Sequence, residues 1–159
     1  MKANFKLSNP VHFLALGFGA GLLKPAPGTW GTLAAVPLVL LAAQFFNFDS
    51  YLFVFVCVIA FFLGVYLCGK SAKDVGVHDH SAIVWDEFVG LFVAMIWVPL
   101  SWKTLLLAFV LFRIFDIVKP WPISWLDKHV HGGFGIMIDD VLAGLMACFV
   151  IHLALYAGF

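Results

Sequence analysis

The sequence predicts an all-α integral membrane protein, folded as a helical bundle of about six helices of which several cross the membrane. Hydrophobic residues make up 64% of the chain and charged residues only 11%, whereas about a quarter of the residues in soluble domains are charged. The mean hydropathy is +1.05. Apolar runs of helical length alternate with short polar turns. The 159 residues contain no repeat and no long linker, so a single membrane-embedded domain is expected over residues 1–159.

The first apolar run, residues 11–23, is too short to cross a bilayer, and we expect a re-entrant or interfacial helix there. It follows Lys2 and Lys6 and superficially resembles a signal peptide. Because no small-x-small cleavage site precedes Lys24, we expect the segment to be retained. The prolines and glycines of residues 24–32 then predict a break before the next helix.

Five longer apolar segments follow, and each is a candidate for crossing the membrane. The expected spans are residues 33–48, 51–67, 83–100 and 104–118, and a last one that starts near Ile136. The first of these is a tilted or slightly short span. Residues 69–81 and 119–131 are the polar loops between them.

Lysine and arginine lie mainly on one side of these predicted spans. With the N-terminus in the cytoplasm, the loops 69–81 and 119–131 also lie inside, and Lys103 is the only basic residue outside. Such a bias is typical of cytoplasmic loops. The sequence therefore predicts a multi-pass protein whose polar loops face the cytoplasm.

Charged residues also interrupt three of the predicted helices at their cytoplasmic ends. They occur in pairs: Asp86 with Glu87, Arg113 with Asp116, and Asp139 with Asp140. Ionisable residues inside a membrane segment are costly, so their default interpretation is functional. Because the pairs come from three helices and share one depth, we expect a single site at the inner membrane surface.

Carboxylates that face one another without a counter-charge repel, and a hard divalent cation such as Mg²⁺ or Mn²⁺ removes the conflict. The candidate metal ligands are Asp86, Glu87, Asp116, Asp139 and Asp140. Adjacent residues differ by about 100° around a helix axis, so one member of each adjacent pair should face the site while the other supports it. The glycine-rich turn at residues 132–135 offers backbone N–H groups that suit an anion.

Basic residues near these carboxylates suit a phosphate group brought to the metal. The candidates are Arg113 and Lys119, with Lys24 less directly placed. Arg113, Asp116 and Lys119 are spaced by three, so they line one stripe if the helix continues to Lys119, and Pro120 should end it there.

His78 and Asp79 are candidates for proton transfer, although a solvated loop histidine is the alternative interpretation of His78.

Several functions are excluded by what the sequence lacks. The formal net charge is zero and no basic stripe occurs, so nucleic acid is not an expected partner. Cys57, Cys68 and Cys148 are widely spaced in apolar runs, which disfavours a zinc site. Arg113 is the only arginine, and neither a Walker A nor a G-x-S-x-G motif is present. Phosphoryl chemistry in this chain would therefore depend on carboxylates and a metal ion.

Four sequence blocks, in this order, resemble the phosphatidylglycerophosphatase A family. They are residues 24–32 (KPAPGTWGT), 76–88 (GVHDHSAIVWDEF), 112–123 (FRIFDIVKPWPI) and 132–144 (GGFGIMIDDVLAG). The resemblance implies a magnesium-dependent phosphatase of the bacterial inner membrane that converts phosphatidylglycerophosphate to phosphatidylglycerol and phosphate. Soluble relatives of that family are all-α bundles, which suggests six helices here with residues 11–23 as one of them. Lys24 and Thr29 of the first block become candidates for binding the substrate.

Our hypothesis from the sequence is that one or two Mg²⁺ ions held by these carboxylates position a water molecule for in-line attack on the phosphomonoester. A covalent aspartyl-phosphate is the open alternative for the nucleophile. Two other functions compete: a metal-dependent lipid headgroup phosphotransferase, and a small cation or proton carrier. A carrier needs polar residues through the full bilayer depth, and residues 33–46, 51–68 and 88–100 offer almost none. The oligomeric state and the preference among lipid phosphates stay open.

Overall fold

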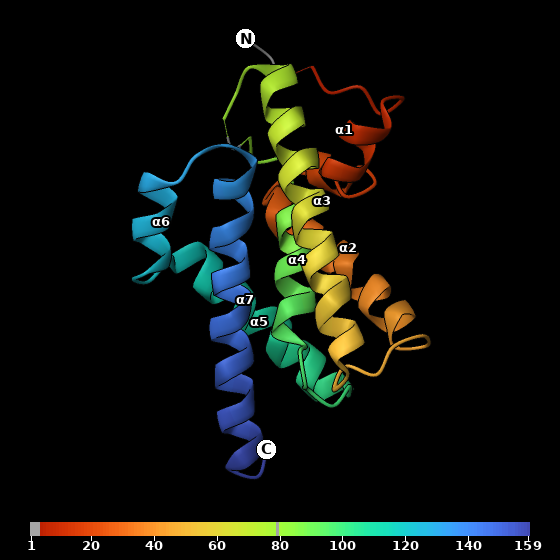
Figure 1. Cartoon of the computed structure of the whole chain (residues 1–159), viewed down its shortest axis with the longest axis vertical. Helices are drawn as coiled ribbons and strands as arrows, with labels where there is room; N and C mark the ends of the chain where they lie inside the picture. The colour runs from red at the N-terminus through yellow and green to blue at the C-terminus, as the bar shows by residue number, and fades with distance from the viewer. Residues whose placement is uncertain (1–3, 79) are drawn as a thin grey trace.

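The computed structural model describes residues 4–78 and 80–159, and over these residues it is all-helical with no strand (Figure 1). The elements are α1 (Pro10–Ala15), a short 3₁₀ helix η1 (Ala20–Leu22), α2 (Pro27–Ala42), α3 (Tyr51–Val75), α4 (Trp85–Ala94), α5 (Trp102–Val118), α6 (Ile123–His129) and α7 (Gly132–Tyr156). The all-α prediction is confirmed, with seven α-helices in the described chain instead of about six.

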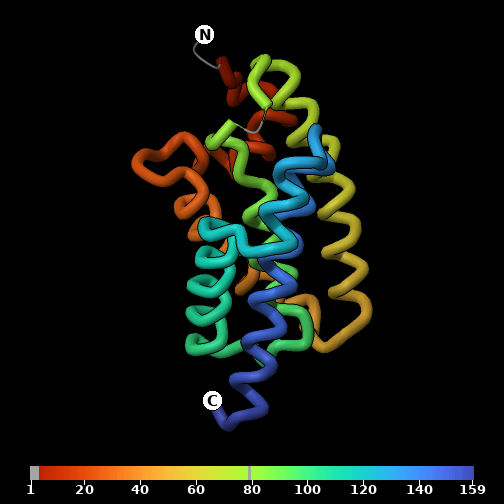
Figure 2. Tube along the Cα trace, turned by 90° about the vertical axis from the view of Figure 1, so that its left-hand side faces the viewer, coloured from red at the N-terminus to blue at the C-terminus, as the bar shows by residue number. Residues whose placement is uncertain are grey.

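The last helix, α7, is the element around which the others pack. It contacts α4, α3, α5 and α6, and its C-terminal turns extend beyond the rest of the bundle (Figures 1 and 2). The first described residues and the C-terminus lie at opposite ends of the molecule. Fully buried side chains such as Phe53, Phe112 and Met137 fill the space between these helices.

Two glycines bring α4 and α7 into backbone contact. A Cβ atom on Gly144 would collide with the carbonyl oxygen of Gly90, and one on Gly90 would collide with the ring of Phe112. Asp86 lies four residues before Gly90, and Asp140 lies four residues before Gly144. The two carboxylates therefore stand about one helical turn from the closest contact of their helices.

The first predicted helix, residues 11–23, is broken in two. Between α1 and η1 the chain turns with positive φ angles at Gly17, Phe18 and Gly19. A Cβ atom on Gly17 would lie 2.8 Å from side-chain atoms of Val84 and Phe88, so this turn packs tightly on the start of α4.

The prediction of a break at residues 24–32 is wrong for its second half. Helix α2 begins at Pro27, because proline lacks the N–H that the first helical position leaves unused. The Thr32 hydroxyl donates to the Gly28 carbonyl at 2.9 Å and lies inside the helix.

The glycine-rich turn at residues 132–135 is likewise the first turn of α7. Glycine is needed there for close packing, since a Cβ on Gly133 would meet the carbonyl oxygen of Val65, and one on Gly135 would meet that of Val130.

Helix α3 continues to Val75, past its predicted end at residue 67. Lys70 and Asp74 form an ion pair on its last turns, and Gly76 ends it with a φ of 69°. Polar residues thus extend this helix where a loop was expected, because one face of its last turns is solvated.

Helix α4 is shorter than the predicted span 83–100 and ends at Ala94. The following turn is held by Trp97, whose backbone N–H donates to the Phe48 carbonyl at 2.8 Å and whose indole N–H donates to the Asp49 carbonyl at 3.0 Å. Helix α6 lies within the predicted loop 119–131 and was not expected.

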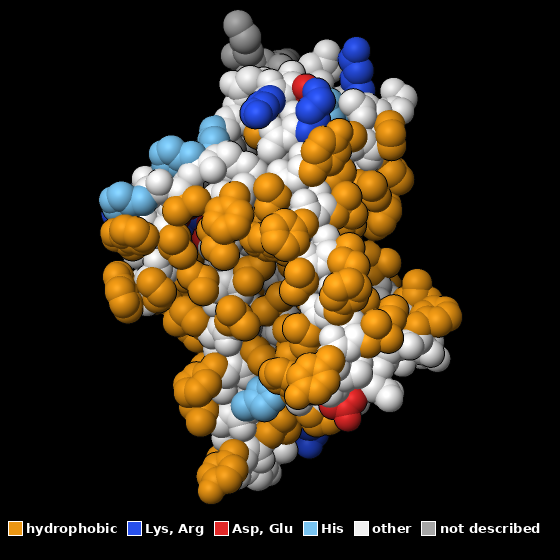
Figure 3. Space-filling model, in the orientation of Figure 1, with side chains coloured by type: hydrophobic (Ala, Val, Ile, Leu, Met, Phe, Trp, Pro, Cys, Tyr) orange, Lys and Arg blue, Asp and Glu red, His pale blue; other side chains and the backbone are white. Residues whose placement is uncertain are grey.

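Two described helices, α3 and α7, are long and apolar enough to cross a membrane, with 25 residues each. Helix α2 is also apolar but shorter. Large hydrophobic side chains are exposed across α3 and α7, where they cover most of the face seen in Figure 3.

Candidate active site

Three buried carboxylates form the centre of the site. Asp86 and Glu87 come from the first turn of α4, and Asp140 comes from α7. One oxygen atom of each can be chosen so that all three lie within 4.8 Å of one another. The side chains were expected to converge from separate helices, and the structure brings these three together.

The cluster fits a hard divalent cation. Glu87 Oε2 and Asp140 Oδ2 are buried and accept no hydrogen bond from the described residues. Buried carboxylate oxygens without a donor are costly unless a cation satisfies them. Because every donor atom is a carboxylate oxygen, the set suits Mg²⁺ or Mn²⁺ better than a thiophilic metal.

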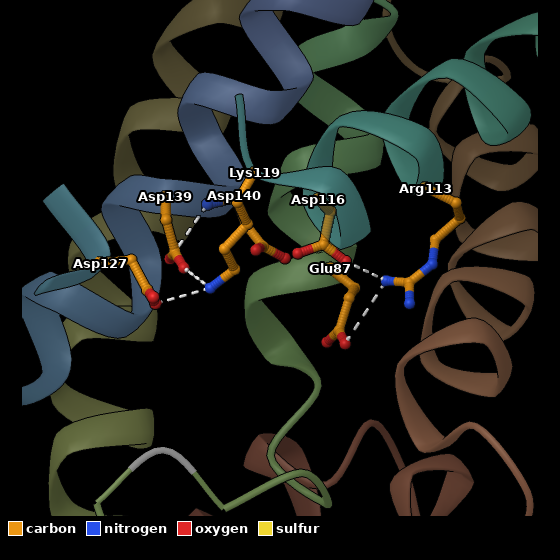
Figure 4. A network of polar contacts seen from close by, with 7 residues as sticks. All are labelled: Glu87, Arg113, Asp116, Lys119, Asp127, Asp139 and Asp140. Atoms are coloured by element: carbon orange, nitrogen blue, oxygen red, sulfur yellow. Dashed lines mark hydrogen bonds and ion pairs between the residues drawn. The ribbon is translucent and has the colours of Figure 1, made fainter. Parts of the chain in front are cut away.

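Arg113 on α5 lies beside this cluster and bridges two acidic residues (Figure 4). Its Nη1 atom is 2.5 Å from Asp116 Oδ2 and 3.8 Å from Glu87 Oε1. The Nε atom of Arg113 is buried and has no acceptor among the described residues. The guanidinium group therefore joins α5 to α4 and keeps a donor for a further anion.

Lys119 does not continue the stripe that Arg113 and Asp116 begin. Helix α5 ends at Val118, and Lys119 caps it in the left-handed conformation with a φ of 45°, directly before Pro120. The predicted end of this helix is confirmed, but the side chain of Lys119 turns towards α6 and α7.

The ammonium group of Lys119 binds two carboxylates, Asp127 Oδ1 at 2.6 Å and Asp139 Oδ2 at 2.7 Å (Figure 4). Partial burial by itself would lower the pKa of Lys119, but hydrogen bonds to Asp127 and Asp139 raise that pKa above its ordinary value. Through these two ion pairs, the charged side chain of Lys119 joins the end of α5 to α6 and α7.

The two adjacent acidic pairs behave differently. Asp139 and Asp140 point to different partners, as expected for neighbouring positions on a helix. Asp86 and Glu87 were expected to diverge as well, but both reach the cluster. Both residues lie in the first turn of α4. The side chain of Glu87 is longer than that of Asp86, so its carboxylate can reach the cluster from the neighbouring position.

The first turn of α2 forms one wall of the site. A Cβ atom on Gly28 would lie 3.0 Å from Arg113 Nη2 and would collide with Glu87 Oε1. Thr29 is half-buried next to it, in the same helical turn. Lys24 is exposed ahead of this turn. The sequence reasoning did not identify Gly28 as a site residue, although it stands within the recognised 24–32 block.

His78 lies at the edge of the site and not in the cluster. Its Nε2 atom accepts a hydrogen bond from the Gly132 N–H at 2.8 Å, at the start of α7. It lines a polar cavity of about 250 Å³ together with Asp127, His131 and Asp139. Asp79, the other proposed proton-transfer residue, lies outside the described residues.

Asp127 on α6 was also missed by the sequence reasoning, because it lies in a segment that was expected to be a loop. An acidic residue eight positions after Lys119 is a weak signal by itself.

In the described site, six carboxylates surround two cationic side chains, so the site carries an excess of negative charge that a metal ion would balance.

Comparisons with known proteins agree with one another. A family model described as phosphatidylglycerophosphatase A matches residues 13–155. A Haemophilus influenzae protein named phosphatidylglycerophosphatase A is 50% identical over 151 residues, which are 94% of this chain and 91% of the relative. An Escherichia coli protein of the same name is 48% identical over 152 residues, covering 95% of this chain and 87% of the relative.

A more distant relative, from Bacteroides thetaiotaomicron, is named as a candidate phosphatidylinositol-3-phosphatase. It is 34% identical over 146 residues, which are 89% of this chain and 91% of the relative. No solved structure matches the chain.

Proposed function

This chain belongs to the phosphatidylglycerophosphatase A family, and we propose that its buried carboxylate cluster is the centre at which it removes phosphate from phosphatidylglycerophosphate. It is a phosphoric monoester hydrolase of phospholipid biosynthesis. Family membership selects this activity over a lipid headgroup phosphotransferase and over a cation or proton carrier. The lipid product is phosphatidylglycerol.

The single observation that carries the proposed centre is the approach of Asp86, Glu87 and Asp140 to within 4.8 Å. In our proposal these three residues hold Mg²⁺. The bound ion would neutralise charge on the phosphomonoester and help to activate the attacking water. Asp116 and Asp139, which the sequence also suggested as ligands, serve instead to position Arg113 and Lys119.

Arg113 is the proposed binding residue for the terminal phosphate. It is held in place by Asp116 and Glu87, so its orientation is fixed before substrate binds. A guanidinium group donates through several N–H groups to phosphate oxygens. Gly28 leaves the space between Arg113 and Glu87 open, and Thr29 and Lys24 continue this wall towards the exposed surface.

Water is our proposed nucleophile, and His78 is the proposed residue for carrying a proton away from the site. His78 shares a polar cavity with Asp139, which is adjacent in sequence to Asp140. Acid quench of a single turnover with ³²P-labelled substrate distinguishes this route from a covalent one. An aspartyl-phosphate leaves ³²P on the denatured protein, whereas direct attack by water leaves ³²P only in the lipid and in free phosphate.

We also propose that the protein is inserted in the bacterial inner membrane as a multi-pass protein with this site on the cytoplasmic side. Helices α3 and α7 are long and apolar enough to cross, and the last turns of α3, which carry Lys70 and Lys73, pack against the first turn of α7, close to the site. The diacyl part of the substrate would then stay at the depth of the membrane's hydrocarbon while only its headgroup enters the cluster.

The decisive experiment measures phosphate release from phosphatidylglycerophosphate by purified full-length protein, with Mg²⁺ and after exhaustive chelation. We expect chelation to abolish turnover and Mg²⁺ to restore it. A parallel measurement of Mg²⁺ binding by calorimetry gives a readout that does not depend on turnover. Full activity without any divalent cation would contradict the metal centre.

A further inference from the structure

An apolar groove lies between α5 and α7, beside the turn that leads into α6. Its volume is about 250 Å³, and almost all of its lining is hydrocarbon. The residues that line it include Phe115, Pro122, Leu142, Met146, Phe149 and Val150. The mechanism of phosphate removal uses none of these side chains.

Both walls of the groove begin close in sequence to charged residues of the site. Phe115 on α5 directly precedes Asp116, and Pro122, just before α6, follows Lys119 by three residues. On α7, Leu142 and Met146 follow Asp139 by three and seven residues, so they lie within about 60° of it around the helix axis. The groove therefore begins about one helical turn from Asp139, the residue that pairs with Lys119.

We propose that this groove holds one acyl chain of the lipid phosphate while its headgroup occupies the carboxylate site; the inference rests on the proposed function. The groove extends from Leu142 to Val150, about 12 Å along α7 and away from the cytoplasmic end. Half of a bilayer's hydrocarbon core is about 15 Å thick, so the groove is as deep as much of one leaflet. A lipid that enters it from that leaflet presents its headgroup at the level of Lys119.

A second apolar groove, between α3, α4 and α7, does not have this relationship to the site. Its α7 wall contains Ile138, Val141 and Leu145, of which Leu145 also lines the first groove. These three residues lie about 100°, 160° and 120° from Asp139 around the helix. The groove between α5 and α7 is therefore the one whose α7 wall shares a helix face with Asp139.

Such a groove would raise the rate by fixing the position of the headgroup, and not by binding the acyl chain tightly. Lipid tails are as apolar as the groove, so a chain that moves from the bilayer into it gains little hydrophobic free energy. A chain held beside α7 fixes where the headgroup can lie, and small displacements of a reacting group reduce the rate strongly. Blocking the groove should thus lower turnover of long-chain lipid without altering the chemistry of the headgroup.

The test compares two substrates on full-length protein in detergent: long-chain phosphatidylglycerophosphate, and its water-soluble deacylated headgroup. Met146→Trp fills the groove two turns from Asp139, and Val150→Trp fills it three turns away. Both should lower kcat/KM for the long-chain lipid by about five-fold or more while leaving that for the deacylated substrate within about two-fold. Val58→Trp, which fills the other apolar groove, is the matched control and should change neither value.

Two outcomes would overturn the proposal. One is a loss of equal size on both substrates in both groove variants, which means that the tryptophans disturb the site itself. The other is an unchanged kcat/KM on both substrates, which means that only ordinary bilayer lipid fills the groove. Failure of the unmodified protein to release phosphate from either substrate would instead contradict the proposed function.

Discussion

Asp139 and Asp140 are neighbours on α7, but their carboxylates belong to two different networks. Asp140 joins Asp86 and Glu87 in the buried cluster, whereas Asp139 Oδ2 lies 2.7 Å from the ammonium group of Lys119. One helical turn thus contributes both a proposed metal ligand and a link to α5 and α6. Substitutions at the two positions should have different consequences.

Asp140→Asn should lower kcat by more than about 100-fold, whereas Asp139→Asn should lower it by roughly 10-fold because it acts through the position of Lys119. The distinguishing measurement is phosphate release as a function of Mg²⁺ concentration. Asp140→Asn should raise the Mg²⁺ concentration needed for half-maximal rate, and Asp139→Asn should leave it unchanged. Asp49→Asn, an exposed change at the opposite end of the bundle, is the control. Equal Mg²⁺ dependence in both site variants would show that Asp140 is not a ligand.

Removing the metal ion should make Asp140→Asn more thermally stable than the unmodified protein, which is the reverse of their order with Mg²⁺ bound. Without a divalent cation, three buried carboxylates repel one another, and Asp140→Asn relieves part of that repulsion. The variant should then melt roughly 2 to 8 °C above the unmodified protein. With saturating Mg²⁺, binding to the intact cluster should stabilise the unmodified protein above the variant. Melting curves in detergent, with chelator and with Mg²⁺, test this crossing, and parallel shifts in both proteins would refute it.

The site could be predicted from the sequence more fully than the helix boundaries could. Charged residues are rare in the apolar segments of this chain, and burying them costs free energy. Asp86, Arg113 and Asp140 could therefore be recognised as candidate site residues from the sequence. Their convergence from three helices followed from a count of membrane crossings. That count was made with spans different from the observed helices, but the charged residues of α4, α5 and α7 still come together.

The boundaries failed where tertiary contacts decide the local structure. Glycines at residues 132–135 predict a turn by propensity, yet they form helix because Gly133 must pass close to the backbone of α3. Trp97 and its bonds to the 47–50 turn shorten α4, and nothing local in residues 83–100 indicates this. The role of Lys119 was also beyond the sequence pattern, because its direction depends on a left-handed backbone conformation at the end of α5.

Arg113→Lys should lower kcat/KM by about 10- to 100-fold despite the retained charge. The planar guanidinium contacts Asp116 and Glu87 and still has a donor to spare, and a lysine ammonium group cannot reproduce that geometry. If Arg113 binds the phosphate, KM should rise as well as kcat fall. Lys103→Ala, far from the site at the start of α5, should leave both parameters unchanged. Wild-type kinetics in Arg113→Lys would show that only the charge matters.

Lys119 should stabilise the protein evenly across the neutral pH range. Its folded-state pKa lies above the unfolded value of about 10.5, so its stabilising contribution is complete below pH 10.5 and is lost only as the pH rises through the folded-state pKa. The difference in melting temperature between the unmodified protein and Lys119→Gln should therefore be constant from about pH 6 to 9. A difference that changes within this window would mean that another group in the Asp127–Lys119–Asp139 link titrates there.

Gly28→Ala should reduce activity strongly with little effect on the fold. The new methyl group would lie against Glu87 and Arg113, and alanine is otherwise a better helix former than glycine in α2. Displacing the guanidinium from its position should lower kcat/KM by roughly 100-fold, while the melting temperature should fall little.

Gly31→Ala in the same helix is the matched comparison, because its methyl group would press on the buried side chain of Val84 and not on Glu87 or Arg113. That variant should lose thermal stability and keep most of its kcat/KM at a temperature where it is folded. Circular dichroism melts and phosphate-release kinetics on both variants separate the two effects. If the pattern is reversed, with Gly28→Ala unstable but active, the first turn of α2 supports the bundle and does not form a wall of the phosphate site.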